Sequence, residues 1–279
     1  MKPAGPRKRV EQCGHGHAAV VSLTLRIARS ALTRPTRVAY GDGPSQYGEL
    51  HLPRRAGGPR PVAVLLHGGH WRTRFGGLVC RPLAADLVRR GWAAWNLEYR
   101  RLGEGRGGGG GWPMTFDDVA AGIDHLAVLG GARLDLGRVV LIGHSAGGQL
   151  ALWAATRTAP QVDVHGVVAL APVTDLTRAG ASARALMGGS PDEVPERWAV
   201  ADPMRCALPS VPVVVVHPAG DRTIPCARSQ EYVERCRAAG ADVSLVVPAG
   251  EGHRDPIDPS SASWRAAATW LERLAPGRT

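Results

Sequence analysis

Residues 138–148 read RVVLIGHSAGG, and this stretch decides the fold class. It opens with an unbroken apolar run, which is typical of a strand covered on both faces. Gly143 and Gly147 then bracket Ser145, and an Ala- and Leu-rich segment of helical character follows. A strand that turns sharply into a helix exposes the residue at the turn at the carboxyl edge of a sheet. Ser145 is therefore the candidate nucleophile.

On both sides of this stretch, short apolar runs alternate with segments of helical period. Such alternation implies right-handed crossovers and a mostly parallel central sheet flanked by helices, which is the α/β class. The apolar runs predict strands at 47–52, 61–66, 92–97, 138–142, 164–170, 211–216 and 243–247. The periodic segments predict helices at about 79–90, 116–126, 228–239 and 260–274, and another directly after Ser145. The longest departure, around 172–210, has the size of a small cap segment.

The strand predicted at 61–66 runs directly into HGGHW at 67–71. Acyl transfer through a tetrahedral intermediate needs backbone N–H groups fixed where the carbonyl oxygen becomes anionic. Glycine lets that backbone approach closely, and the loop leaves the carboxyl end of an early strand. We therefore expect the N–H groups of Gly69, His70 and Ala146 to form an oxyanion hole.

Four other residues around the two turns are expected to support the site rather than to react. His67 would hold its loop through backbone hydrogen bonds, with Gly68 beside it. Trp71, like His70, is expected to shape the pocket, and His144 is expected to pack beside the nucleophile. The alternative for the whole motif is a glycine-rich strand-to-helix turn with an incidental histidine.

A serine nucleophile needs a general base, and the base needs a carboxylate that orients it. The strand predicted at 211–216 leads to Asp221, and the strand at 243–247 leads to His253. Nucleophile, acid and base thus follow one another along the chain, each just beyond a predicted strand. We expect Ser145, Asp221 and His253 to form a catalytic triad.

The other histidines and aspartates are less well placed for these two roles. Each lies before the acid loop, inside a helix, ahead of a strand, or too close in sequence to the base to orient it easily. They are His217, His125, Asp242, Asp255 and Asp258. Glu251 stays open as a substitute for Asp221.

The formal net charge of +10 at pH 7 brings a nucleic-acid or membrane partner into consideration. The distribution of that charge argues against one. Residues 1–37 hold eight basic side chains and one acidic side chain, so the remainder is nearly balanced. We therefore expect no nucleic-acid partner.

Five cysteines lie at scattered positions, without metal-ligand spacing or a paired motif. Their odd number favours a reducing compartment, and we expect a cytoplasmic protein without a metal ion or organic cofactor. The longest apolar stretch near the start, Ala18 to Leu25, is too short to span a membrane. We expect no stable membrane insertion, and the sequence indicates no particular oligomeric state.

Taken together, the motifs resemble the esterase and lipase branch of the α/β-hydrolases, close to kynurenine-formamidase-like and feruloyl-esterase-like hydrolases. The matching stretches are HGGHW at 67–71, EYRR at 98–101, GHSAG at 143–147, GGSPDEVPER at 188–197, GDRTIP at 220–225 and GEGHRDPIDP at 250–259. The resemblance implies an α/β-hydrolase domain at 36–279, preceded by a basic, flexible leader at 1–35. It also implies the triad named above, with Gly69 and His70 as oxyanion donors.

The chain departs from this family at two positions. The variable place in the HGGxW motif is often aromatic and is His70 here, and the residue after the catalytic histidine is often Phe and is Arg254 here. We expect both residues near the pocket mouth, where they bear on the substrate more than on the chemistry.

The expected function is that of a serine hydrolase, which cleaves a carboxylic ester of a small or medium-sized substrate through an acyl-enzyme. An amide or formamide hydrolase, acting on N-formylkynurenine-type or peptide amides, shares the fold and the triad and stays open. Two further alternatives are a non-catalytic binding protein on a hydrolase scaffold and an adaptor that contacts membranes or acidic partners through the leader.

Overall fold

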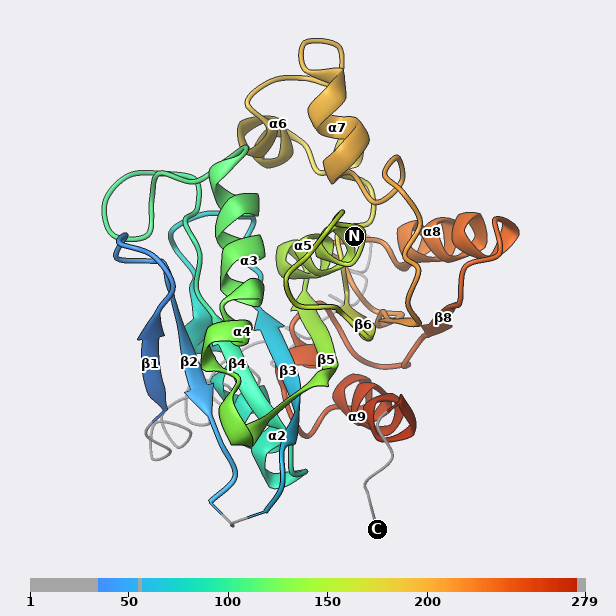
Figure 1. Cartoon of the computed structure of the whole chain (residues 1–279). Coiled ribbons are helices and arrows are strands. Elements are labelled where there is room, and N and C mark those ends of the chain that lie inside the picture. The colour runs from blue at the N-terminus through green and yellow to red at the C-terminus, as the bar shows by residue number, and fades with distance from the viewer. Residues whose placement is uncertain (1–34, 55–56, 275–279) are drawn as a thin grey trace, which may run out of the picture.

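The computed structural model describes residues 35–54 and 57–274, so the leader expected at 1–35 lies almost entirely outside the described residues. The described strands form one sheet in the order β1-β2-β4-β3-β5-β6-β7-β8 (Figure 1). They are β1 (Thr36–Ala39), β2 (Tyr47–His51), β3 (Arg60–Leu66), β4 (Ala93–Leu97), β5 (Leu134–His144), β6 (Gly166–Leu170), β7 (Val213–Val216) and β8 (Val243–Val246). β2 runs antiparallel to β1 and β4, and the other pairs are parallel. The mostly parallel sheet predicted from the sequence is confirmed.

Two strands differ from the prediction. β1 was not predicted, because its four residues are largely exposed and carry no apolar alternation. β5 begins at Leu134, ahead of the apolar run, and a register irregularity between Pro61 and Val62 accommodates the extra length beside β3.

Helices cover both faces of the sheet. Successive side chains along a strand point to opposite faces, so each strand contributes side chains to both layers. In β3, Val62 and Val64 belong to one core, whereas Ala63 and Leu65 belong to the other. The first core packs against α3 (Met114–Asp124), α5 (Ala146–Ala154) and α8 (Cys226–Ala238), and the second against α2 (Arg81–Arg89) and α9 (Ala262–Leu274). Each fully buried Val or Leu contributes about 1.5–3 kcal/mol. Two cores therefore fix the carboxyl ends of the strands from opposite sides.

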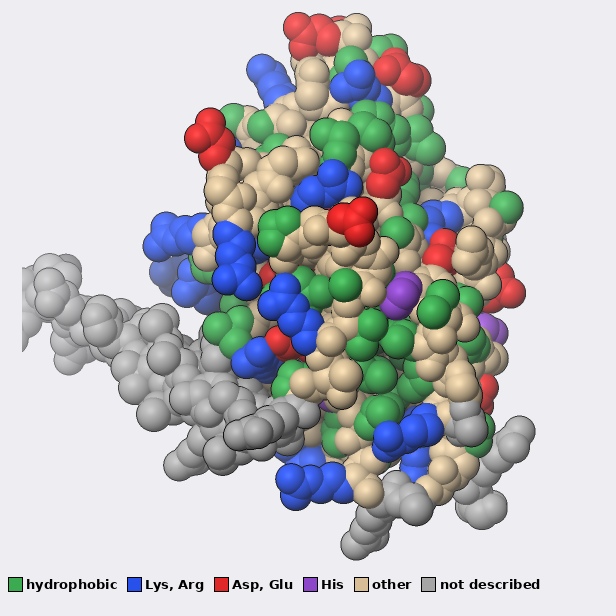
Figure 2. Space-filling model, turned by 60° about the vertical axis from the view of Figure 1, so that its left-hand side comes forward, with side chains coloured by type: hydrophobic (Ala, Val, Ile, Leu, Met, Phe, Trp, Pro, Cys, Tyr) green, Lys and Arg blue, Asp and Glu red, His purple; other side chains and the backbone are tan. Residues whose placement is uncertain are grey.

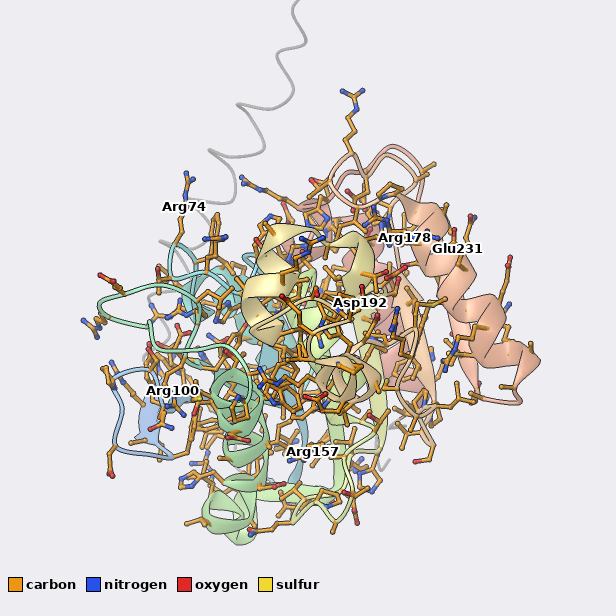
Figure 3. All side chains as sticks on the ribbon, turned by 90° about the horizontal axis from the view of Figure 1, so that it is seen from above. Arg74, Arg100, Arg157, Arg178, Asp192 and Glu231 are labelled. Atoms are coloured by element: carbon orange, nitrogen blue, oxygen red, sulfur yellow. The ribbon has the colours of Figure 1, made fainter. Side chains whose placement is uncertain are left out.

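The segment 172–210 forms an excursion beyond that carboxyl edge, at the top of Figure 1. It contains the short helices α6 (Ala181–Met187) and α7 (Pro195–Ala201), whose buried side chains include Leu186 and Trp198. Arg178 and Glu231 lie next to each other when the molecule is seen from above (Figure 3), and their ion pair at 2.8 Å joins the excursion to α8. On the face shown in Figure 2, acidic side chains are most frequent toward the top and basic ones on the left-hand flank.

Candidate active site

Ser145 occupies the turn between β5 and α5 with φ 55° and ψ −117°, a conformation that a residue with a Cβ rarely adopts. The backbone on either side holds it there. Its N–H donates to the carbonyl of Leu170 at 2.9 Å, and its carbonyl accepts from the N–H groups of Gly148 at 2.9 Å and Val173 at 3.2 Å. The strain is thus maintained by the adjoining strand β6 and the first turn of α5.

The glycines of this turn are required by contact rather than by conformation. A Cβ on Gly143 would lie 2.1 Å from the carbonyl oxygen of Gly147, and one on Gly147 would lie 2.1 Å from that of Leu66. Neither contact is sterically possible. The close packing of α5 on β3 and β5 therefore depends on both glycines.

The structure brings Ser145, His253 and Asp221 together in one hydrogen-bonded line. The Ser145 hydroxyl lies 2.9 Å from Nε2 of His253, and Nδ1 of the same ring lies 2.7 Å from Oδ2 of Asp221. In this arrangement Nδ1–H donates to the carboxylate and Nε2 is left to accept the serine proton. These distances lie within the range in which a base can take a proton from a nucleophile.

The Asp221 carboxylate accepts hydrogen bonds from other groups in addition to His253. Its Oδ1 accepts from the backbone N–H groups of Thr223 at 2.8 Å and Ile224 at 2.9 Å, and Oδ2 lies 3.2 Å from Nε2 of His217. Burial opposes ionisation, but the donors from His217, His253 and Ile224 outweigh it and hold the pKa of Asp221 below its usual value. The carboxylate is therefore an anion at neutral pH.

The rival candidates for acid and base do not take the places of Asp221 and His253 in the line that leads to Ser145. His217 is fully buried, with Nδ1 2.7 Å from the Ser229 hydroxyl and Nε2 2.9 Å from the carbonyl of Ile224. The Glu251 carboxylate accepts from the N–H of Ala262 at 2.5 Å, at the start of α9. It therefore acts as a cap for that helix and does not orient His253.

The loop after β3 has the backbone geometry expected of an oxyanion hole. Gly69, His70 and Trp71 all have positive φ values, of 126°, 56° and 55°. Such a run turns successive N–H groups to one side of the chain. Within the described part of the chain, the N–H groups of Gly69, His70 and Ala146 donate to no protein acceptor.

Gly68 lets this loop approach the nucleophile. A Cβ at position 68 would lie 2.8 Å from the carbonyl oxygen of His144 and 3.1 Å from the Cβ of Ser145. The two turns are therefore in direct contact. Trp71 supports the loop from the core, since it is 1% exposed and its indole N–H donates to Gln149 Oε1 at 3.1 Å.

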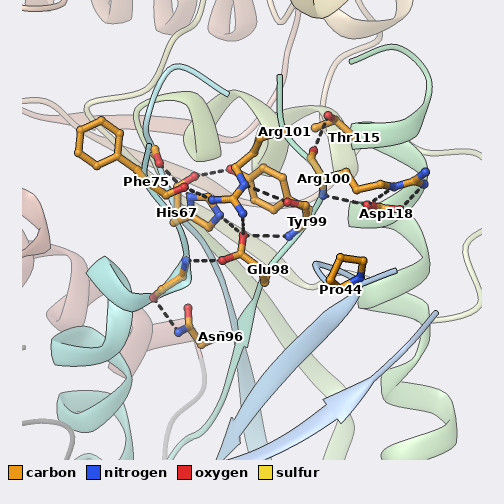
Figure 4. Close-up of polar contacts among 12 residues, drawn as sticks. Pro44, His67, Phe75, Asn96, Glu98, Tyr99, Arg100, Arg101, Thr115 and Asp118 are labelled. Atoms are coloured by element: carbon orange, nitrogen blue, oxygen red, sulfur yellow. Dashed lines mark hydrogen bonds and ion pairs between the residues drawn. The ribbon is translucent and has the colours of Figure 1, made fainter. Parts of the chain in front are cut away.

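His67 holds the loop from below through a network that the sequence did not reveal (Figure 4). Its Nδ1 lies 2.9 Å from the carbonyl of Gly68 and its Nε2 lies 2.9 Å from Oε1 of Glu98. The ring stacks on Tyr99 at 4.4 Å, and the Tyr99 hydroxyl donates to the His67 carbonyl at 2.6 Å. Arg101 completes the network, with Nη2 3.2 Å from the same carboxylate oxygen. The available signal was the EYRR motif at 98–101, which follows a buried strand.

His144 contacts the loop that carries the base. Its Nε2–H donates to the backbone carbonyl of His253 at 2.8 Å, and the two rings lie 5.0 Å apart. Burial, assisted by the charge of His253, lowers the pKa of His144 to about 3. The ring is therefore neutral at neutral pH and acts as a fixed hydrogen-bond donor.

A small cavity of about 180 Å³ opens beside the Ser145 hydroxyl. Its lining residues come from loops at the carboxyl edge of the sheet and from the 3₁₀ helix η1 (Gly77–Cys80) that precedes α2. They are Gly68, Gly69, His70, Phe75, Val79, His144, Ser145, Thr223, His253, Arg254 and Ile257. Both His70 and Arg254 are thus at the pocket, whereas Trp71 is not. No residue of the excursion 172–210 lines it, so the expected cap contributes no wall to this pocket.

A larger groove, of about 860 Å³, lies at the opposite edge of the sheet, around Arg60 and Trp92. Ligands of open α/β sheets bind at the carboxyl ends of the strands, which is the edge where Ser145 lies. The smaller cavity is therefore the candidate site. In residues 35–54 and 57–274, no group of three or more His, Cys, Asp or Glu side chains is arranged to hold a metal ion. No helix in these ranges is long and apolar enough to cross a membrane.

The family model described as BD-FAE matches residues 49–235. The matched region contains the loop with Gly69, the turn with Ser145 and the loop with Asp221. It ends before His253.

Similarity to curated proteins is distributed over most of the chain. Isoprenylcysteine alpha-carbonyl methylesterase of Arabidopsis thaliana is 25% identical over 252 residues, covering 78% of this chain and 56% of the relative. The esterase LipC of Mycobacterium tuberculosis is 27% identical over 247 residues, covering 78% of this chain and 59% of the relative. The chain spans little more than half the length of these relatives.

Solved structures of esterases share the fold. A bacterial heroin esterase superimposes with a TM-score of 0.73 at 21% identity, covering 92% of this chain and 89% of that one. Esterase B of Lactobacillus rhamnosis has a TM-score of 0.74 at 18% identity, covering 93% and 95%. At such identities the likeness establishes the α/β-hydrolase fold, as the sequence predicted.

Proposed function

The chain belongs to the BD-FAE family, and we propose that it is a carboxylesterase in which Ser145 is the nucleophile, His253 the base and Asp221 the orienting acid. The observation that carries this proposal is the line of two hydrogen bonds, at 2.9 Å and 2.7 Å, that joins the three side chains. The two curated relatives are named as esterases, which favours an ester over an amide or formamide.

In the first half of the reaction, His253 Nε2 takes the proton of the Ser145 hydroxyl while Oγ forms a bond to the ester carbonyl carbon. The carbonyl oxygen becomes anionic and accepts from the N–H groups of Gly69, His70 and Ala146. When the tetrahedral intermediate collapses, the bond to the alkoxy oxygen breaks, and His253 returns its proton to the departing alcohol.

In the second half, a water molecule loses a proton to His253 and attacks the acyl carbon, which releases the carboxylic acid and restores Ser145. Asp221 stabilises the imidazolium in both halves. The pocket of about 180 Å³ is smaller than the cavities that hold drug-sized ligands, which supports a small acyl or alcohol group.

The test is labelling with a fluorophosphonate, which reacts with activated serines, together with turnover of a short p-nitrophenyl ester. We expect the wild type to be labelled and Ser145→Ala to be unlabelled, with turnover reduced by about 10⁶-fold. Equal labelling of the two proteins would overturn the assignment of Ser145 as the nucleophile, and a wild type with neither labelling nor turnover would leave the non-catalytic scaffold as the interpretation. Faster hydrolysis of N-formylkynurenine than of the short ester would replace the ester substrate by the formamide.

A further inference from the structure

We infer that Arg254 selects esters that carry an anionic group close to the scissile carbonyl. This inference rests on the proposed esterase function and adds a substrate class to it. Among the residues that line the cavity are one arginine and three histidines, and no aspartate or glutamate.

Among the described residues, the Arg254 side chain has no hydrogen-bond or ion-pair partner. Its side chain is exposed, and within the described part of the chain it forms neither an ion pair nor a side-chain hydrogen bond. By contrast, Arg100 is paired with Asp118 at 2.7 Å, and Arg101 with Glu98 at 3.2 Å. The guanidinium of Arg254 therefore keeps its full hydrogen-bonding capacity for a ligand.

The carboxylates closest to Arg254 in sequence, those of Glu251, Asp255 and Asp258, accept hydrogen bonds from other groups, and so does the Asp221 carboxylate. Asp255 uses Oδ2 to accept from the N–H of Gly252 at 2.6 Å, and Asp221 is fully buried and bonded to two histidines. Among the described residues, none of these carboxylates forms an ion pair with Arg254. A carboxylate brought in by a substrate meets no such competition.

The backbone beneath Arg254 is fixed. The residue follows His253 directly and precedes a short 3₁₀ helix, η4 (Asp255–Ile257), whose last N–H donates to the Arg254 carbonyl at 3.3 Å. The guanidinium is thus carried by the same turn as the base. Because the cavity is small, an anion within its reach is only a few atoms from the carbonyl under attack.

The remaining walls favour a short carbon chain between the two groups. Phe75, Val79 and Ile257 line the cavity with apolar side chains. Short methylene segments are stabilised there, whereas a carboxylate is stabilised only at the arginine, since its fork of N–H groups matches carboxylate geometry. The substrate class that fits is a short monoester with a free carboxylate.

The experiment compares kcat/KM for ester pairs that differ only by carboxylate against primary amide. Monoethyl succinate and ethyl succinamate place the group on the acyl side, and acetoxyacetate and acetoxyacetamide place it on the alcohol side. We expect the wild type to prefer the anionic member of at least one pair. In Arg254→Met that preference should fall by about tenfold, and 1 M salt should reduce it in the wild type.

Arg222→Met is the matched control, because Arg222 is an exposed arginine close to the pocket that does not line it. We expect this variant to keep the preference of the wild type. The inference is overturned if the wild type does not prefer either anionic ester, if Arg254→Met leaves the preference unchanged, or if Arg222→Met lowers it equally. Ser145-dependent hydrolysis of the neutral esters in any of these cases would show that the esterase proposal stands while the selectivity proposal falls.

Discussion

Asp221, in the loop after β7, and Asp202, at the end of α7, have fully buried side chains, yet their pKa values move in opposite directions. Asp221 is held below its usual value. Asp202 is raised to about 6, because burial outweighs the N–H groups of Leu176 and Met204 that donate to Oδ1. Among the described residues, its Oδ2 has no hydrogen-bond partner, and the Nε atom of Arg205 lies 3.6 Å from it.

The difference shows that burial alone does not decide the charge of a carboxylate in this fold. The number of donors aimed at each oxygen decides it. Asp221 has donors at both oxygens and is suited to stabilise an imidazolium. Asp202 has donors at one oxygen only, and these join the two ends of the excursion 172–210.

The largest expected effect comes from removing the charge at each aspartate in turn. Asp221→Asn should lower kcat by about 10⁴-fold, because an amide cannot hold His253 in the tautomer that accepts the serine proton. Asp202→Asn makes the same chemical change at an equally buried site and should leave kcat unchanged. Steady-state kinetics of both variants on one short ester measure the contrast. A similar loss in the two variants would mean that general destabilisation, and not the role of Asp221, causes the effect.

A smaller effect is expected when Asp221 loses only one donor. In His217→Asn the shorter side chain cannot reach Oδ2, so the free energy of unfolding at pH 7 should fall by about 3 kcal/mol. His217→Gln keeps an N–H near the position of Nε2 and should recover part of that loss.

The dependence of the unfolding free energy on pH tests whether this loss comes from the charge of Asp221. Because the folded pKa of Asp221 is lowered, its stabilisation is present above the ordinary value of 3.8 and is lost as the pH falls below it. The gap between wild type and His217→Asn should therefore narrow in acid, as measured by urea unfolding. A gap that is constant from pH 7 to pH 3 would assign the loss to packing instead.

The smallest effect is expected from the charge of Asp202. Its folded pKa of about 6 exceeds the ordinary 3.8, so the folded state gains from the proton at low pH and loses that gain as the pH rises through this window. Relative to Asp202→Asn, the wild type should lose about 2 kcal/mol of unfolding free energy between pH 4 and pH 7. Urea unfolding at these two values measures it, and a difference that does not change with pH would contradict the assignment.

The parts of the site that the sequence predicts are those next to strand ends. Ser145, Asp221 and His253 each follow a strand, and the carboxyl ends of parallel strands meet at one edge, so their proximity follows from local patterns. The contact between His217 and Asp221 does not follow in this way. It depends on the conformation of the loop after β7, which the periodicity of the sequence does not predict.

The network around Glu98 was missed for a related reason. Glu98, Tyr99 and Arg101 act on His67 across two strands, β3 and β4, whose adjacency is a property of the whole sheet. The excursion 172–210 was predicted as a cap because of its length. None of its residues lines the pocket, and its path depends on the packing of Leu186 and Trp198, which length does not indicate.

One consequence of the Trp71–Gln149 hydrogen bond concerns how this protein can diversify. Gln149 also donates through Nε2 to the backbone carbonyl of Ala201 at 2.9 Å, so the oxyanion loop is tethered through α5 to the end of α7. Because the final acceptor is a main-chain carbonyl, the tether does not depend on which side chain stands at position 201. Substitutions on the outer surface of the excursion can thus accumulate during evolution while the oxyanion loop keeps this tether.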